Sequence, residues 1–72
     1  MEPKSQDLRI YQLRVRGHLD EEFVASFCPS GTTLTHEDDT ALLANIQTDQ
    51  AGIVGLVRHL HNLGCTLIAL HS

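Results

Sequence analysis

The first hydrophobic segment of the chain, residues 8–16, alternates between apolar and polar side chains. Alternation with a period of two is typical of a β-strand that buries one of its faces. The apolar face consists of Tyr11, Leu13 and Val15. The opposite face carries Gln12, Arg14 and Arg16, together with Leu8 and Ile10 if the strand runs straight. This segment therefore predicts a half-buried strand, which ends at Gly17.

A short helix is predicted directly after this strand. Asp20 can cap it, because its carboxylate accepts hydrogen bonds from backbone N–H groups that lack partners in the first helical turn. Phe23 and Phe27 are four residues apart and therefore share one side of the helix. The segment Cys28-Pro29-Ser30-Gly31 ends the helix, since proline disfavours helical geometry in the residue before it.

Two short runs, residues 32–36 and 41–47, flank a polar segment at 37–40. The first run is rich in β-branched residues and the second is apolar, which together predict a β-hairpin. The turn contains neither an Asn-Gly nor an Asp-Gly pair, so its type stays open.

A longer helix is predicted from about residue 50 to residue 63, with Asp49 as its cap and Gly64 after its end. One apolar stripe runs along it through Ile53, Leu56, Val57, Leu60 and Leu63. The run at 65–71 is short and apolar, and it is predicted to form a fourth strand.

Two glycines, Gly52 and Gly55, lie inside this second helix. Each destabilises a helix by about 0.8–1 kcal/mol relative to Ala. We therefore expect something to approach that side of the helix closely. The first helix is the favoured neighbour, and a partner helix or a ligand is the alternative.

The order strand-helix-strand-strand-helix-strand predicts an α+β domain of the ferredoxin-like βαββαβ class. Right-handed crossovers place both helices on one face of a four-stranded antiparallel sheet, with the strands at 8–16 and 41–47 in its centre. Residues 8–72 are expected to form this single domain, after a flexible tail at 1–7. The expected core from the sheet is Tyr11, Leu13, Val15, Leu34, Leu42, Ala44, Ile46, Ile68 and Leu70. The helices are expected to cover it with Phe23, Phe27, Ile53, Leu56, Val57 and Leu60.

The other face of the sheet has no predicted helix to cover it. We expect interface residues there at Ile10, Gln12, Leu43, Asn45, Leu67 and Ala69. This face is too apolar to be merely solvated, so we expect it to pack against a second copy or another protein. The alternative is a solvated sheet with scattered apolar residues, which monomers tolerate.

Composition and charge exclude some partners and locations for this chain. The chain has 72 residues, 42% of them hydrophobic, and a net charge of −4, which argues against a nucleic-acid partner. No apolar stretch approaches the roughly 20 residues that span a bilayer, and no secretory signal opens the chain, so a cytoplasmic protein is expected. Cys28 and Cys65 are far apart in sequence and are expected to be reduced, buried thiols rather than a disulfide.

Arg14 and Arg16 are the most informative charged residues, because both project from a central strand onto the open face. Two guanidiniums at this spacing can bind a carboxylate or a phosphate. The alternative, which is favoured, is pairing with acidic side chains of the same or a partner subunit, such as Glu37.

Other patterns predict no chemistry. The segment His36-Glu37-Asp38-Asp39 is expected to be a solvated turn, since neighbours along a strand point to opposite faces and do not converge on a metal. His59 and His61 are two residues apart on a helix and cannot chelate one ion together. No nucleophile motif is present, so we expect no enzymatic activity and no cofactor.

The chain resembles a group of small uncharacterised bacterial proteins. Three segments carry this resemblance: residues 11–20 (YQLRVRGHLD), residues 34–43 (LTHEDDTALL), and Asp49-Gln50-Ala51 followed by Gly55-Leu56 and Leu63-Gly64. The resemblance covers most of residues 10–70 and implies no activity. Members of the group typically have Trp where Phe23 or Phe27 stands here, and they lack the Cys28-Pro29 segment.

A weaker resemblance covers half of the domain. Asp49-Gln50-Ala51-Gly52-Ile53, with Leu60, Gly64 and Leu67-Ile68, is similar to the first loop, helix and strand of ACT domains, which bind amino acids. In ACT domains the motif follows the first strand, whereas here it follows the third.

Together these observations predict a non-enzymatic interaction or regulatory module that forms a homodimer through its open sheet face. The alternative function is a small-ligand or anion-binding domain that uses Arg14 and Arg16.

Overall fold

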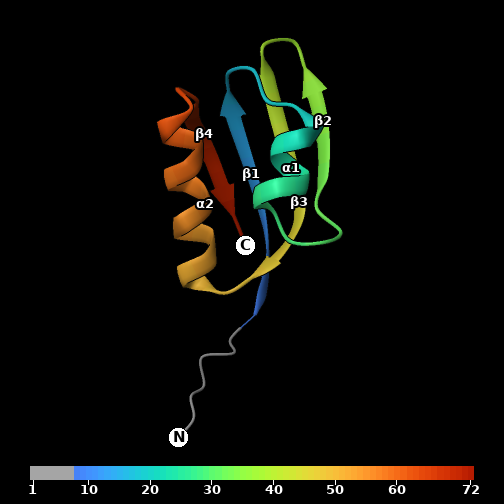
Figure 1. Ribbon diagram of the computed structural model, residues 1–72, viewed down its shortest axis with the longest axis vertical. Coiled ribbons are helices and arrows are strands. Elements are labelled where there is room, and N and C mark those ends of the chain that lie inside the picture. The colour runs from blue at the N-terminus through green and yellow to red at the C-terminus, as the bar shows by residue number, and fades with distance from the viewer. Residues whose placement is uncertain (1–7) are drawn as a thin grey trace, which may run out of the picture.

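The computed structural model describes residues 8–72, and the predicted tail at 1–7 lies outside the described residues. The elements are β1 (Arg9–Arg16), α1 (Glu21–Phe27), β2 (Thr33–Glu37), β3 (Thr40–Thr48), α2 (Gln50–Asn62) and β4 (Thr66–His71), as Figure 1 shows. Four antiparallel strands and two helices make this an α+β fold, as predicted.

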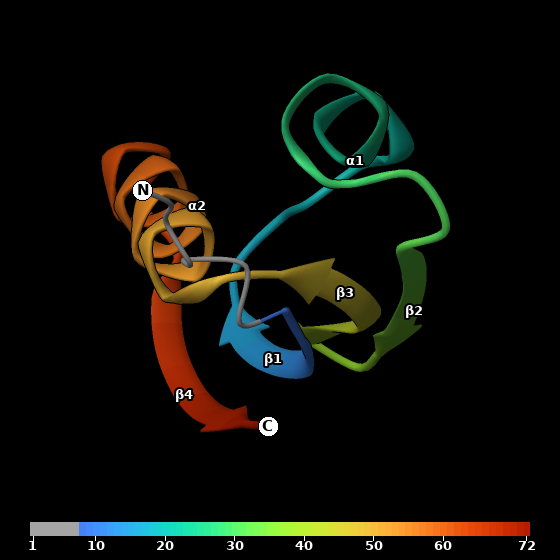
Figure 2. The ribbon, with the colours of Figure 1, turned by 90° about the horizontal axis from the view of Figure 1, so that it is seen from below.

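The strands lie in the order β2-β3-β1-β4, so β1 and β3 form the centre of the sheet and β2 and β4 its edges. Figure 2 shows both helices on the same side of the sheet, with α2 on the β4 side and α1 on the β2 side. The other side of the sheet carries no helix of residues 8–72; we call it the open face.

Both helices begin directly after the aspartates that were predicted to cap them, Asp20 and Asp49. The Asp20 carboxylate accepts a hydrogen bond from the Phe23 N–H at 3.1 Å, and the Asp49 carboxylate accepts one from the Gly52 N–H at 2.8 Å. Each bond satisfies a backbone donor that has no partner inside the helix. Gly64 follows α2 with a φ of 91°, a left-handed conformation that glycine adopts without steric penalty.

The core lies between the sheet and the helices. The alternation in β1 is confirmed, because Tyr11, Leu13 and Val15 are buried and their neighbours face the open side. The complete buried cluster is Tyr11, Leu13, Val15, Leu19, Phe23, Ala41, Leu43, Ile46, Ile53, Leu56, Leu60 and Cys65. Leu34, Val24, Cys28 and Val57 pack against this cluster while partly exposed.

The predicted faces of β3 are wrong in its first half. Ala41 and Leu43 are fully buried, whereas the predicted core residues Leu42 and Ala44 are only half-buried. Leu43 pairs with Leu13 and Leu42 pairs with Arg14. Because directly opposed residues share a face of the sheet, Leu42 lies on the open face and Leu43 lies under the helices.

A β-bulge at Asn45 explains this error. Tyr11 pairs with Ile46 and Leu13 pairs with Leu43, so β3 places one more residue than β1 between these two pairs. Asn45 has a φ of 58°, in the left-handed region that Asn tolerates better than most residues. The extra residue lets Leu43 and Ile46 face the same side, which strict alternation forbids.

Strand β4 also departs from the prediction. A register shift separates the pair Val15–Leu67 from the pair Arg14–Ala69, and Leu67 therefore lies on the helix side. Ile68 and Leu70, which were predicted to be core residues, are each 44% exposed. Strand β4 is an edge strand, so no other strand of residues 8–72 lies beside its outer side. Phe27, another predicted core residue, is 50% exposed at the end of the short helix α1.

Two further core residues, Leu19 and Cys65, come from connecting segments; the burial of Cys65 was predicted, whereas Leu19 was not among the predicted core residues. Leu19 precedes α1, and its backbone carbonyl accepts a hydrogen bond from Nε2 of His36 at 2.7 Å. Cys65 lies against Gly17, where an added Cβ would come within 3.1 Å of the Cys65 sulfur. Gly17 has a φ of 137°, so the chain leaves β1 in a conformation that few other residues adopt.

The positions of Leu42 and Leu43 can be tested with a matched pair of substitutions. We expect Leu43→Ala to lower the free energy of unfolding by about 2–5 kcal/mol, because it creates a cavity in the core. Leu42→Ala should lower it by less than half as much, since Leu42 is only half-buried. Urea unfolding of both variants measures the difference, and equal losses would contradict the observed register of β3.

The bulge is tested at Asn45. We expect Asn45→Val to lower the free energy of unfolding by about 1–2 kcal/mol, because a β-branched residue is strained in the left-handed region. Asn45→Gly should retain the stability of the parent chain. Gln47→Val, at an exposed position of the same strand, is the control for a general effect of valine. If Asn45→Val were as stable as Gln47→Val, the bulge would be absent.

Candidate functional site

Strand β1 presents its polar residues on the open face at the centre of the sheet. The neighbours of Arg14 on this face are Leu42 of β3 and Ala69 of β4, and His71 lies opposite Gln12. The alternation of β1 thus places Arg14 and Arg16 where the sequence predicted them, outside the core. No helix of residues 8–72 covers this face of the sheet, as Figure 2 shows.

Both arginines are paired with carboxylates of the β2–β3 hairpin. Nη1 of Arg14 lies 3.0 Å from Oε1 of Glu37 and 3.4 Å from Oγ1 of Thr40. Nε of Arg16 lies 3.5 Å from Oδ2 of Asp39. The pairing of Arg14 with Glu37 that we considered from the sequence is therefore present. An external anion would have to compete with carboxylates for both guanidiniums.

The geometry of the hairpin turn brings these carboxylates into place. Asp38 has a φ of 54°, which lets β2 reverse into β3 with only two residues between the strands. The Thr40 hydroxyl donates a hydrogen bond to the Glu37 carbonyl at 2.8 Å and closes the turn. The segment predicted to be a simple solvated turn thus supplies the acidic partners of Arg14 and Arg16.

The predicted interface residues do not all reach the open face. Ile10 is 60% exposed there, Gln12 is exposed, and Ala69 is half-buried opposite Arg14. Leu43 was predicted to lie at this interface, and that prediction is wrong because the Asn45 bulge turns its side chain into the core. Asn45 itself is exposed at the bulge.

Leu67 is a second correction to the predicted open face. It lies opposite Val15, a core residue, so it belongs to the helix side of the sheet although it is 43% exposed. The register shift in β4 reverses its side relative to a straight strand. Leu42 therefore takes the place on the open face that was predicted for Leu43, and Leu67 lies on the helix side instead of the open face.

Strand β4 carries three of the eight exposed large hydrophobic side chains among residues 8–72. Leu67, Ile68 and Leu70 are each 43–44% exposed, and the strand contains no Asp, Glu, Lys, Arg or Pro. The outer side of β4 faces no other strand of residues 8–72. We call this strand, with its unpaired side, the β4 edge. The absence of charged residues in β4 could have indicated an exposed, unprotected edge. In the sequence analysis, the apolar character of this strand was instead interpreted as a sign that Ile68 and Leu70 are buried.

Two of the five histidines, His36 and His59, make contacts that connect parts of the fold. His36 is bonded to the Leu19 carbonyl, and the ring of His59 lies on that of Phe27, with 4.5 Å between their centroids. The Phe27–His59 contact joins α1 to α2 at the rim of the core. In the described part of the chain, no group of three or more His, Cys, Asp or Glu residues is arranged to hold a metal ion.

The two cysteines are free thiols, with Cys65 buried and Cys28 half-buried at the end of α1. Burial raises the pKa of the Cys28 thiol, because desolvation penalises its thiolate form. The thiolate is the reactive form of cysteine, so this environment protects Cys28 from modification.

Among residues 8–72, no helix is long and apolar enough to cross a lipid bilayer.

Residues 10–71 match the model of a family described as Domain of unknown function (DUF8691). This match confirms the resemblance to a small uncharacterised group, whereas the similarity to ACT domains is not confirmed. No curated protein and no solved structure matches the chain.

The environment of Cys28 predicts slow alkylation. We expect iodoacetamide to modify Cys28 more slowly in the folded protein than in urea, with the rate rising at a higher pH than in the unfolded chain. Mass spectrometry across neutral to alkaline pH measures both rates, and a Cys28→Ala variant identifies the contribution of Cys65. Folding raises the pKa of this thiol, so its neutral form contributes to the free energy of unfolding. This contribution is fully present at pH values below the pKa of the thiol in the unfolded chain, and it is lost as the pH rises through the pKa of the thiol in the folded protein. A folded-state midpoint at or below the unfolded one would contradict the prediction.

Proposed function

The chain belongs to the DUF8691 family, and we propose that it is a non-enzymatic interaction module that associates with a second copy of itself through its sheet. The β4 edge is the observation that carries this proposal. Its unpaired N–H and C=O groups and its exposed apolar side chains form a surface to which another strand can be added.

Natural proteins protect exposed sheet edges with charged residues, proline, bulges or a covering segment. Strand β4 has a register shift but neither charged residues nor proline. The other edge is treated differently, because in β2 Glu37 forms an ion pair and His36 is bonded to the Leu19 carbonyl. The contrast between the two edges favours β4 as the side where association occurs.

The β4 edge is the place where charge opposes a second copy least. The domain carries a net charge of −4, so two copies repel each other over most of their surfaces. The β4 edge contains no acidic side chain and therefore offers a contact with little repulsion. Antiparallel pairing of two β4 strands about a two-fold axis is an isologous contact, the commonest kind in homodimers.

Association through the open face, with Ile10, Gln12, Asn45 and Ala69, is the other arrangement of the same homodimer. Ile10 supports it, since this large apolar side chain is exposed on an uncovered face. The ion pairs of Arg14 and Arg16 make that face more polar than the β4 edge, which contains no Asp, Glu, Lys or Arg. We therefore place the contact at the edge.

The anion-binding alternative assigns Arg14 and Arg16 to a carboxylate or phosphate ligand. Glu37 and Asp39 already occupy the positions that such a ligand would take, at 3.0 Å and 3.5 Å from the guanidiniums. Exposed ion pairs of this kind contribute about 0–1 kcal/mol, so a strongly held anion can displace them. This function ranks second.

We also propose that the domain is a ferredoxin-like fold and acts in the cytoplasm. The element order of β1 to β4 with α1 and α2, the strand order β2-β3-β1-β4 and the placement of both helices on one side support the fold assignment. Two free thiols, one of them buried, are compatible with a reducing compartment.

The homodimer and its contact surface can be tested with two matched substitutions. We expect the parent chain to be a dimer by size-exclusion chromatography with light scattering. Ile68→Lys, at the β4 edge, should weaken the dimer by at least about tenfold, because lysine opposes edge-to-edge pairing. Ile10→Lys, the same change on the open face, should leave the dimer intact.

Circular dichroism of both variants controls for folding. The reverse pattern, with Ile10→Lys monomeric and Ile68→Lys dimeric, would move the contact to the open face and overturn the edge assignment. A parent chain that stays monomeric at millimolar concentration would contradict self-association altogether.

A further inference from the structure

The acidic residues of the chain are unevenly distributed. All nine Asp and Glu residues lie within residues 1–49, and residues 50–72, which form α2 and β4, contain none. Helix α2 lies on the β4 side of the sheet (Figure 2). The helix and the strand therefore share one side of a domain whose net charge is −4, and two copies that meet there bring no carboxylates of α2 or β4 together.

Helix α2 has a second stripe of residues beside the one that faces the core. Spacings of four, three and four residues keep its members on one side of the helix. We call it the outer stripe, and it consists of Gln50, Val54, Val57 and His61. The α1 side of α2 is marked by His59, which contacts Phe27 of α1. His61 follows His59 by two residues and points about 200° away from it, so the outer stripe faces away from α1.

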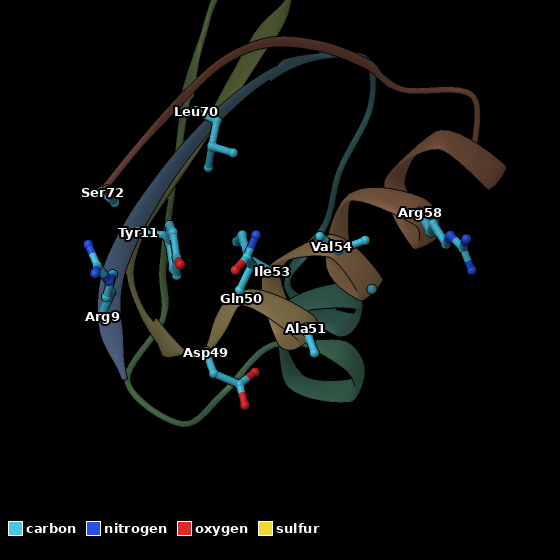
Figure 3. A pocket seen from close by; sticks show the side chains of 11 residues that line it. Arg9, Tyr11, Asp49, Gln50, Ala51, Ile53, Val54, Arg58, Leu70 and Ser72 are labelled. Carbon is cyan, nitrogen blue, oxygen red and sulfur yellow. The ribbon is translucent and has the colours of Figure 1, made fainter. Parts of the chain in front are cut away.

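The outer stripe borders the same surface as the helix side of β4. A groove runs between α2 and the strands β1 and β4, and its lining includes Gln50 and Val54 of α2 and Leu70 of β4 (Figure 3). Leu70 lies opposite the core residue Leu13 and is 44% exposed. Figure 3 shows the Arg58 side chain pointing away from this groove. A molecule that pairs with the β4 edge therefore reaches the outer stripe as well.

Strand pairing alone is a weak basis for a homodimer. Strand β4 has six residues and therefore spans about 20 Å. Two paired strands without packed side chains are only marginally stable in water. Stable protein–protein interfaces bury about 1,200–2,000 Å² of surface in total. A contact through β4 therefore needs a second layer of side chains beside the paired strands.

The symmetry of the pairing determines which element supplies this layer. A two-fold axis that makes two β4 strands antiparallel stands perpendicular to the sheet, so the helices of both copies lie on the same side of the joined sheet. Because α2 is the helix on the β4 side, the two α2 helices become neighbours across the axis, and each α1 lies farther away (Figure 2). Packed helices are about 8–10 Å apart, the width of about two strands, so one α2 on each side of the axis matches this spacing.

We propose that the homodimer has two layers of contact: the paired β4 strands and, beside them, the outer stripes of the two α2 helices. This inference rests on the β4 contact of the proposed function and names the surface that completes it. Val54 is the central residue of the helix layer, because its apolar side chain is 50% exposed, whereas Val57 already packs against the core. The occupant of this helix surface is thus a second copy of the same helix.

The glycines of α2 do not make room for α1, so the neighbour favoured by the sequence is wrong. A Cβ on Gly52 would clash with the Thr48 side chain at the end of β3. A Cβ on Gly55 would meet no atom within 4 Å. Gly55 lies about 200° around the helix from the core residue Ile53, so it faces away from the sheet. It is next to Val54 in sequence but outside the outer stripe, which makes it a matched control position.

Two lysine substitutions at these adjacent positions test the helix layer. We expect Val54→Lys to raise the dissociation constant of the dimer at least about tenfold, because it places two like charges at the contact between the helices. Gly55→Lys adds the same charge outside the outer stripe and should leave the dissociation constant unchanged. Sedimentation equilibrium over a dilution series measures both constants. Circular dichroism verifies that both variants fold, as expected for side chains that point to solvent in the single domain.

A measurement on the parent chain tests the same contact without any substitution. A soluble gadolinium chelate broadens the NMR signals of exposed methyl groups. We expect the broadening of the Val54 methyl signals to fall as the protein concentration rises through the dissociation constant, because the second α2 excludes the chelate. Leu63 is 59% exposed and lines a separate groove with Phe27 on the α1 side. Its methyl signals should be broadened equally at all concentrations.

The outcomes separate this inference from the homodimer itself. If Ile68→Lys weakened the dimer while Val54→Lys did not, and the Val54 methyl groups stayed exposed, strand pairing would stand and the helix layer would be overturned. Equal weakening by Val54→Lys and Gly55→Lys would overturn it too, since charge anywhere on α2 would then suffice. A parent chain that stays monomeric, or a dimer lost only in Ile10→Lys, would overturn the β4 contact and this inference together.

Discussion

The burial of one face of strand β1 is the constraint on which the rest of the structure depends. Leu13 and Val15 are completely buried, and β1 is the only strand of the sheet of residues 8–72 that pairs with both β3 and β4. Because side chains alternate along a strand, this burial also forces Arg14 and Arg16 onto the opposite face. The covered core and the charged open face are therefore two consequences of one alternation.

Departures from regular alternation decide which apolar residues reach the surface. In β3 the bulge at Asn45 directs Leu43 and Ile46 to the same side, and in β4 a register shift directs Leu67 toward the helices. Each extra residue reverses the faces of the strand segment beyond it. The open face thereby exchanges Leu43 for Leu42 and loses Leu67, and β4 carries three of the eight exposed large hydrophobic side chains among residues 8–72.

The domain thus presents surfaces of three different characters. On the open face, cations and anions are paired within the chain, through Arg14 with Glu37 and Arg16 with Asp39. The β4 edge is uncharged and unpaired, as expected of a contact between proteins. A groove beside α2 is lined by Ile53, Val54 and Leu70 together with Tyr11, which is 8% exposed. The two helices lie on one side of the sheet, α1 on the β2 side and α2 on the β4 side, so the opposite side and the outer side of β4 are not covered by a helix of residues 8–72.

The sequence by itself determined the elements, the caps and the faces of β1. These depend on local physics: the period of two in residues 8–16, the carboxylates of Asp20 and Asp49 at helix starts, and the stripe of α2. The tertiary structure alone decided the faces of β3 and β4, the exposure of the β4 edge and the groove at Tyr11. A bulge such as that at Asn45 is a property of the pairing of two strands, and an edge is a property of strand order. Neither is encoded in the hydrophobic pattern of one segment, because both depend on which segments meet after the chain has folded.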